Sequence, residues 1–299
     1  MRDFLVDRLP RATPERIEAM LGSGQFVDDL GPLTPDAPFA PEVTIWFHRD
    51  LPDEPPSPFP IPVVHRDENL LVVDKPHFLA SIPRGRHVLE TALVRLRREL
   101  DLPMLSPAHR LDRGTAGLLM FVIRPELRGA SQILFHDHRV HKTYHAIARH
   151  DPALELPRTV RSRIVKHRGV IRATEEPGPA NAETLVELLE QRAELGRYRL
   201  TPRTGRTHQL RLHMCGLGVP ILGDDFYPTL TDRALDDYHR PLQLLASELA
   251  FTDPVTGVEH RFRSSRSLAA WTDPTDWASG PPIPPPLVGG VRVTTEPSS

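Results

Sequence analysis

The sequence predicts an α+β fold with a small N-terminal appendage. Short strand-like segments outnumber helical ones, the two kinds alternate irregularly, and 39% of the 299 residues are hydrophobic. That hydrophobic content supports an ordinary globular core. The irregular alternation excludes the regular βαβ spacing of a doubly wound parallel sheet.

The appendage, residues 1–54, is acidic, with 11 Asp and Glu against 5 Lys and Arg. Pro14 opens a short amphipathic helix that places Ile17, Met20 and Leu21 on one side. A strand is expected over residues 43–47, where β-branched and aromatic residues follow one another. Because this segment lacks a basic helix, we interpret it as a structural cap or the remnant of a binding module.

Two proline-rich stretches set the boundaries of the main domain. Residues 55–62 hold so many prolines that they exclude a regular helix and favour an extended, stiff connector. Residues 271–299 form a Pro/Gly-rich tail, expected to be poorly ordered or to lie along the surface. The main domain is therefore expected over residues 63–270.

Hydrophobic periodicity predicts the elements of this domain in order. One helix face collects leucines: Leu89, Leu93, Leu96 and Leu100. The opposite face of that helix carries arginines: Arg95, Arg97 and Arg98. The apolar run 118–123 predicts a buried strand, and Pro125 is placed to begin a helix that continues to about residue 135. Further strands are expected over residues 70–73, 144–148, 183–189 and 197–202, and a helix over residues 207–217.

The segment from His109 to Gly117 is the most informative in the chain, because it reads HRLDRGTAG and runs directly into the predicted buried strand. Its aspartate, Asp112, lies between Arg110 and Arg113 in a Gly/Thr turn. A carboxylate next to an apolar run must be paired or hydrogen-bonded, since burying it alone costs several kcal/mol. The residues alone leave two interpretations open: a functional carboxylate, or a turn aspartate flanked by solvated charges.

A second motif lies about a hundred residues further along the chain. It reads TGRTHQLRLHM from Thr204 to Met214 and continues through Asp224 to Tyr227. Helix or strand formation alone does not require so specific a pattern. Together the two motifs resemble the HRLDxxTSG and TGRxHQhRhH signatures of pseudouridine synthases of the RluA type, which isomerise uridine in ribosomal and transfer RNA.

Weaker similarities extend this resemblance over roughly residues 63–265. Residues 67–76 resemble the strand that opens the family's catalytic domain, Lys142 and Tyr144 its KxY motif, and residues 245–254 its closing strand. The layout of residues 1–54 is similar to the S4-like module of many such synthases. Two positions depart from the family: Ala116 stands where Ser is usual, and Leu245 where His is usual. Loss of one hydroxyl bond at Ala116 is worth about 1 kcal/mol, which tunes an active site and does not silence it.

The family's reaction breaks the bond from ribose C1′ to N1, turns the base and rejoins it through C5. It involves no redox change and no net hydrolysis, so neither a metal nor an organic cofactor is expected. A carboxylate suits this task, as a nucleophile toward the sugar carbon or as the acceptor of a neighbouring proton. The resemblance implies that Asp112 is this carboxylate, and the sequence leaves both roles open.

By the same resemblance, Arg211 pairs with Asp112 and keeps it ionised and aimed. Tyr144 stacks on the turned-out base and takes the C5 proton, while Arg110 fills the gap that the base leaves. From the residues alone, Arg110 also fits a surface ion pair and Tyr144 a sheet-surface tyrosine. Further substrate contacts are expected from the two motifs: His109, Arg113, Thr115, Arg206, His208, Gln209 and Leu212. The implied fold is a mixed, mainly antiparallel central sheet with flanking helices and a cleft across it.

RNA, ribosomal or transfer, is the expected partner, although the formal net charge is −2. Without residues 1–54 the chain holds 32 basic and 28 acidic residues, a net charge of +4. One acid-free run carries a series of cations: Arg158, Arg161, Arg163, Lys166, Arg168 and Arg172. Such a run is either an RNA contact or a solvated face. No obligatory protein partner is inferred.

Other classes of protein fit less well. No run approaches the roughly 18 apolar residues of a membrane span, and no signal-peptide core follows Met1, so a cytoplasmic protein is expected. The single cysteine, Cys215, excludes an internal disulfide. Histidines crowd one window, at His136, His138, His141 and His145. They lack a convincing zinc pattern, so they are interpreted as solvated or phosphate-facing.

Two further functions stay open as alternatives. A glycoside hydrolase or transferase would need a second carboxylate opposite Asp112, where the resemblance places Arg211. A catalytically silent RNA-binding protein on the same scaffold is disfavoured by the presence of Asp112, Tyr144 and Arg211 together.

Overall fold

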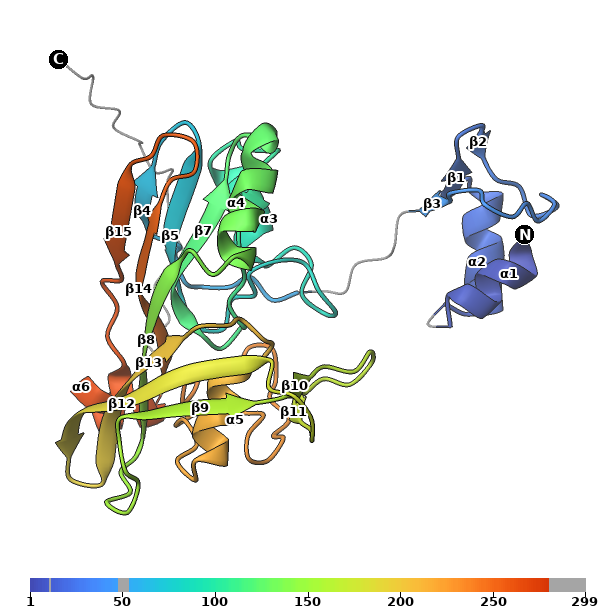
Figure 1. The fold of residues 1–299 in the computed structure, drawn as a ribbon. Helices are drawn as coiled ribbons and strands as arrows, with labels where there is room; N and C mark the ends of the chain where they lie inside the picture. Colours follow the sequence, from blue (N-terminus) through green and yellow to red (C-terminus); the bar gives the residue numbers. More distant parts are fainter. Residues whose placement is uncertain (11, 48–53, 280–299) are drawn as a thin grey trace. The chain divides into compact units, whose positions relative to one another are not determined.

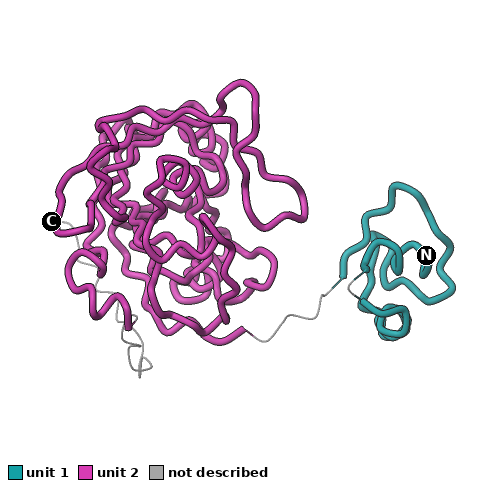
Figure 2. The backbone as a smooth tube through the Cα atoms, turned by 90° about the horizontal axis from the view of Figure 1, so that it is seen from below, with its two compact units in different colours: residues 1–53 teal, residues 54–299 magenta. Residues whose placement is uncertain are grey.

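The computed structural model describes residues 1–10, 12–47 and 54–279 (Figure 1). The chain divides into two compact units, Met1–Asp53 and Glu54–Ser299 (Figure 2). The segment interpreted as a connector belongs to the second unit, because Arg95 donates hydrogen bonds to the carbonyls of Ser57 and Phe59. Part of the predicted tail, residues 280–299, lies outside the described residues.

The first unit is built on two helices, α1 (Arg2–Arg8) and α2 (Pro14–Gly22). The predicted amphipathic helix is confirmed: Pro14 follows the capping residue Thr13, whose hydroxyl accepts the backbone N–H of Arg16. A small sheet of order β2-β1-β3 joins β1 (Phe26–Asp28), β2 (Gly31–Pro32) and β3 (Trp46–Phe47). The strand expected over residues 43–47 is confined to its last two residues.

The predicted α+β class is confirmed in the second unit, whose central sheet has ten strands. Along its main path the order is β4-β5-β7-β14-β8-β13-β12-β9; β15 pairs with β14, and β6 with β7. Every pairing is antiparallel except that of β7 with β14. The strands are β4 (Val63–Arg66), β5 (Leu70–Lys75), β6 (Ser106–Pro107), β7 (Ala116–Val122), β8 (His141–Arg149), β9 (Arg158–Ser162), β12 (Ala182–Arg192), β13 (Leu195–Pro202), β14 (Leu244–Thr252) and β15 (Glu259–Arg263).

Both faces of this sheet are covered, which explains the continuous apolar runs of its inner strands. All residues of β5 and β7 are buried. On β7, Leu119 and Phe121 join the larger core, whereas Leu118 and Met120 join a second core on the opposite face. A separate short ribbon of β10 (Ile164–Val165) and β11 (Thr174–Glu175) extends from the body beyond β9 (Figure 1).

Helices and helical turns complete the second unit: α3 (Ala92–Glu99), η1 (Pro125–Leu127), α4 (Arg128–His136), α5 (Gln209–Gly216), α6 (Ala269–Thr272) and α7 (Pro274–Ser279). The leucine helix is shorter than predicted, because the Thr91 hydroxyl caps α3 and leaves Leu89 exposed. Arg95, which the pattern places opposite the leucines, is itself buried, because its guanidinium donates to the carbonyls described above. The described start of the tail is helical, and the Trp277 indole donates to the carbonyl of Pro241.

Candidate active site

The turn that carries Asp112 connects β6 to the buried strand β7, and side chains from residues 75–81 hold its backbone. The Ser81 hydroxyl donates to the carbonyl of Leu111 (2.7 Å) and accepts the N–H of the same residue (3.0 Å). His77 donates from Nδ1 to the carbonyl of Gly114 (2.7 Å). Within the turn, the N–H of Thr115 donates to the carbonyl of Asp112 (3.1 Å). The backbone of Asp112 is thus fixed while its side chain stays 31% exposed.

Lys75 anchors the same turn from the end of β5. Its ammonium is completely buried and lies within hydrogen-bonding distance of the carbonyls of Pro76 (2.9 Å), Leu79 (2.8 Å) and Arg113 (3.4 Å). Burial, then the charge of Arg266, lowers the pKa of Lys75, and the negative charge of Asp112 opposes this. These carbonyls match the N–H groups of an ammonium, so Lys75 connects the end of β5 to the turn that carries Asp112.

Arg211, on α5, is the second charged centre of the site and is only 3% exposed. Asp224 binds it bidentately, accepting from Nε (2.8 Å) and Nη2 (2.5 Å). Asp225 accepts a further bond from Nη2 (3.0 Å), and the guanidinium lies 4.6 Å from the ring centre of Phe226. Burial acts to lower the pKa of Arg211, but the hydrogen bonds and charge of Asp224, followed by the charges of Asp112 and Asp225, raise it overall. The guanidinium therefore stays charged and fixed.

Asp112 and Arg211 meet as the resemblance implied. Their closest atoms, Oδ2 and Nη1, are 3.5 Å apart, although the residues are about a hundred positions apart in sequence. At that distance the contact is an ion pair without a tight hydrogen bond. The lone pairs of the Asp112 carboxylate are therefore left for another ligand.

Tyr144 reaches the same region from β8, where it pairs with Leu200 of β13 and Ala246 of β14. It is 9% exposed. Burial raises the pKa of the phenol, and the nearby charge of Asp112 raises it further. Tyr144 is consequently a neutral phenol at neutral pH, with its ring at the edge of the larger core.

His208 precedes α5 in the left-handed conformation, with φ of 58°. Its Nδ1 lies 2.9 Å from the hydroxyl of Tyr227, and that hydroxyl donates its one hydrogen to the carbonyl of Ala173 (2.7 Å). His208 must therefore carry its proton on Nδ1 and donate it to Tyr227, which leaves Nε2 as an acceptor. Burial lowers the pKa of His208, while the charge of Asp112 acts in the opposite direction.

Two expected RNA contacts are exposed arginines. Among the described residues, the guanidinium of Arg110 has neither a hydrogen bond nor an ion pair within the chain, so it is available to a ligand. Arg206 is also exposed, and its Nε donates to the carbonyl of Asn181 (3.1 Å). Arg113 differs from both, because it donates from Nη2 to the carbonyl of Leu235 (2.8 Å) and so holds a loop of the protein itself.

The other motif residues lie in the scaffold. His109 stacks on Phe135 at 4.7 Å and accepts the N–H of Met120; burial lowers its pKa to about 3. Gln209 is bonded at both ends of its amide, and Thr115 and Leu212 are buried. These contacts explain why the motifs contain those residue types without requiring that they touch a substrate.

Sequence reasoning assigned no role to Lys75, His77, Ser81, Asp224 or Asp225. The signal available for Asp224 and Asp225 was their place in the extension of the second motif, directly before Tyr227. Nothing local distinguishes the other residues, since their function comes from contacts with a turn about thirty residues away. Within the described part of the chain, no group of His, Cys, Asp or Glu is arranged to hold a metal ion. No described helix is long and apolar enough to cross a membrane.

The α+β domain joins an aspartate of one motif to an arginine of the other, as the resemblance to pseudouridine synthases implied. The model of the RNA pseudouridylate synthase family matches residues 69–215. The chain is 34% identical over 215 residues to the dual-specificity RNA pseudouridine synthase RluA of Pasteurella multocida, an alignment that covers 68% of this chain and 91% of the relative. The chain belongs to this family, and its relatives are of the RluA type.

Other comparisons agree. The dual-specificity RNA pseudouridine synthase RluA of Escherichia coli K12 is 32% identical over 217 residues, which are 70% of this chain and 95% of that protein. Among solved structures, human RNA pseudouridylate synthase domain containing 4 matches with a TM-score of 0.54 and 25% identity, covering 69% of this chain and 88% of the other. The family's reaction is the isomerisation of uridine to pseudouridine in RNA, so the hydrolase and silent-binder alternatives are not favoured.

Proposed function

We propose that this protein converts uridine to pseudouridine at defined positions of ribosomal or transfer RNA, with Asp112 as the essential carboxylate. The observation that carries the proposal is the 3.5 Å contact between Asp112 and Arg211, two residues from separate motifs. The contact keeps Asp112 aimed, while its partial exposure leaves room for a nucleotide. The enzyme then acts in the cytoplasm, where these RNAs are found, without an obligatory protein partner.

In the proposed reaction the target nucleotide leaves the stacked RNA and enters the site, at a cost of a few kcal/mol. The guanidinium of Arg110 occupies the gap, because it is exposed, unpaired among the described side chains and flat enough to stack on bases. Asp112 acts either on C1′ or on the neighbouring 2′ proton as the bond to N1 breaks. The base turns, C5 bonds to C1′, the C5 proton leaves and N1 gains a proton, so the atoms balance without a cofactor.

We expect Tyr144 to stack on the base and to accept the C5 proton. Because burial and Asp112 raise the pKa of its phenol, the hydroxyl remains protonated while the base enters. It can take up the C5 proton only if its own proton moves on to another acceptor in the same step. The role therefore depends on a second acceptor near the phenol, and a pH profile of Tyr144→Phe reports on it.

The RNA strand beyond the target uridine is expected to lie along the ribbon of β9, β10 and β11. Of the cations in the acid-free run, Arg161 forms an ion pair with Glu183 at 2.8 Å, and the charge of Arg163 lowers the pKa of Glu176. Lys166 and Arg172 are bound to backbone carbonyls, which leaves their charge uncompensated. A projecting ribbon with a surplus of positive charge suits a phosphate backbone.

The test is to incubate the purified chain with ribosomal and transfer RNA transcripts and to map pseudouridine by mass spectrometry. We expect Asp112→Asn to abolish the product while RNA binding changes little. Asp232→Asn is the matched control, because Asp232 is exposed and no described residue pairs with it. Product formation by Asp112→Asn at the parental rate would overturn the assignment.

A further inference from the structure

The ammonium of Lys142 is a half-buried cation to which the reaction assigns no part. Lys142 lies on β8, near the start of the strand. Among the described residues, none accepts a hydrogen bond from its ammonium or forms an ion pair with it. Burial lowers the pKa of Lys142, and no charge of a described residue acts against this effect. A cation that is partly removed from water costs free energy unless an anion or an acceptor compensates it.

This ammonium lies where the two sequence motifs of the site approach each other. Lys142 and Tyr144 are two residues apart on one strand, so their side chains leave β8 on the same face, about 7 Å apart. In the first motif, His109 lies close enough for the charge of Lys142 to lower its pKa. In the second motif, Gly205 lies beside the ammonium, since a Cβ at this position would be 3.8 Å from Nζ. Because Gly205 has no side chain, it leaves the ammonium uncovered on that side.

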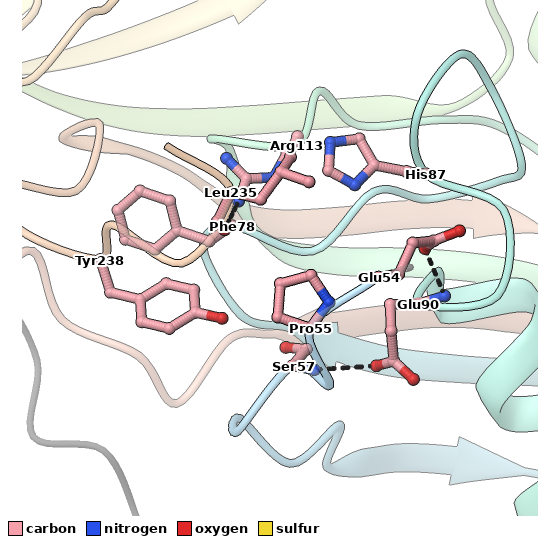
Figure 3. Close-up of a pocket in the computed structure, with 9 residues that line it drawn as sticks. All are labelled: Glu54, Pro55, Ser57, Phe78, His87, Glu90, Arg113, Leu235 and Tyr238. Carbon is pink, nitrogen blue, oxygen red and sulfur yellow. Dashed lines mark hydrogen bonds between the residues drawn. The ribbon is translucent and has the colours of Figure 1, made fainter. Parts of the chain in front are cut away.

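Three other cations near the reacting carboxylate are held by the protein itself. Arg211 is bound by Asp224, and the ammonium of Lys75 lies against three backbone carbonyls. Arg113 donates to the carbonyl of Leu235, and its guanidinium is turned into a small hollow of the protein (Figure 3). The ammonium on β8 differs from all three, because its partner has to come from outside the described part of the chain.

A phosphate of the RNA backbone is the ligand that fits this cation. In a nucleotide the ribose separates the base from the phosphates, so a base stacked on Tyr144 places a phosphate some distance along the same face of the sheet. Lys142 lies at such a distance on that face. Its ammonium is a compact point charge that binds a phosphate from many directions. A neutral acceptor would satisfy the N–H groups but would leave the charge uncompensated.

We propose that Lys142 binds a backbone phosphate that directly adjoins the target uridine. The inference rests on the proposed function and extends it to the way in which the turned-out nucleotide is held. Arg110 fills the gap in the stack, and Lys142 holds the backbone so that the ribose stays beside Asp112. The phosphate compensates an ammonium that has no partner in the free enzyme.

The experiment uses the full chain and a short stem–loop RNA that carries the mapped target uridine. Each phosphate near the target is replaced in turn by an uncharged methylphosphonate, with a 2′-deoxyribose on its 5′ side. The reference RNA carries the same deoxyribose and an ordinary phosphate. We expect one replacement, directly beside the target, to lower kcat/KM about tenfold with the parent enzyme, as for the loss of one charge-assisted hydrogen bond. With Lys142→Met the reference RNA is processed about tenfold more slowly, and the same replacement has no additional effect.

Two control variants separate this contact from a general attraction between charges. Lys142→Arg keeps the cation and should respond to the replacement as the parent enzyme does. Arg139→Gln removes an exposed cation just before β8, where no described residue pairs with the guanidinium. This variant should also keep the parental response to the replacement.

Urea unfolding distinguishes phosphate binding from a structural role. Lys142→Met replaces an unpaired ammonium with an apolar side chain, so the variant should unfold at the same urea concentration as the parent or at a higher one. The proposal is wrong if Lys142→Met loses stability in step with activity, or if it responds to the replacement as the parent does. It is also wrong if every methylphosphonate RNA is processed at the reference rate. Failure of the proposed function differs from these results, because no RNA then gains pseudouridine at all.

Discussion

Removing the negative charge of Asp224 is expected to destabilise the second unit strongly. The Asp224 side chain is 1% exposed and accepts from Arg211 twice and from the N–H groups of Phe226 and Tyr227. In Asp224→Asn the amide keeps one oxygen for the backbone but presents N–H groups to a guanidinium that only donates. Arg211 is then a buried cation without its principal partner, which costs about 3–5 kcal/mol.

The assay is urea unfolding followed by tryptophan fluorescence, since Trp271 and Trp277 lie in the second unit. A loss of about 3–5 kcal/mol corresponds to a decrease in melting temperature of roughly 6–20 °C for a domain of this size. Asp225→Asn is the matched control: Asp225 is 28% exposed and shares one bond with Arg211. It should cost about 1 kcal/mol or less. If the two variants unfold at the same urea concentration, Asp224 does not hold Arg211 as described.

Three further outcomes are expected. Burial lowers the pKa of His77 to about 4 and that of His109 to about 3, so between pH 6.5 and these values the folded state binds fewer protons than the unfolded state. The free energy of unfolding should therefore fall as the pH drops from 6.5 toward 4. His77→Gln should make this fall with pH less steep, as measured by urea titrations at each pH. Arg110→Ala should lower the rate of pseudouridine formation while the melting temperature stays unchanged, because this exposed side chain makes no hydrogen bond or ion pair with a described residue; a matched loss of stability would contradict its role. Arg168→Ala should reduce the slope of log binding constant against log salt by about 1, measured by RNA titration; an unchanged slope would place the ribbon away from the RNA.

The sequence was sufficient to predict the α+β class and most elements, because the apolar patterns of β5 and β7 and the leucine spacing of α3 are local signals. It failed on features set by tertiary contacts. The pattern of α3 predicted Arg95 opposite the leucines, but it did not show that carbonyls of residues 57–59 bind this side chain in the interior. The local sequence cannot indicate such a contact, because the acceptors are backbone carbonyl groups, which every residue has.

At the site, too, the sequence predicted some features and not others. The resemblance of the two motifs to the family was enough to predict that Asp112 and Arg211 lie close together. The spacing of these residues in the sequence does not show this by itself. It was not enough to separate side chains that face the cleft from those that hold it. Gln209 and Arg110 both lie in a motif, but Gln209 is bonded throughout and Arg110 is free of described partners. Only the hydrogen-bond partners distinguish these two roles.

Arg211 is bound by Asp224 and also contacts Asp112, and these two contacts explain why the site contains more than one aspartate. A guanidinium beside a single carboxylate forms a bidentate pair that occupies both oxygens, and a carboxylate bound in that way is a poor nucleophile or base. Here Asp224 takes the Nε and Nη2 edge of Arg211, so Asp112 receives only the remaining Nη1 at 3.5 Å. Arg211 can then aim Asp112 without occupying its lone pairs. By this reasoning Asp224 acts on catalysis through Arg211, and its loss should tighten the pairing of Asp112 as well as weaken the fold.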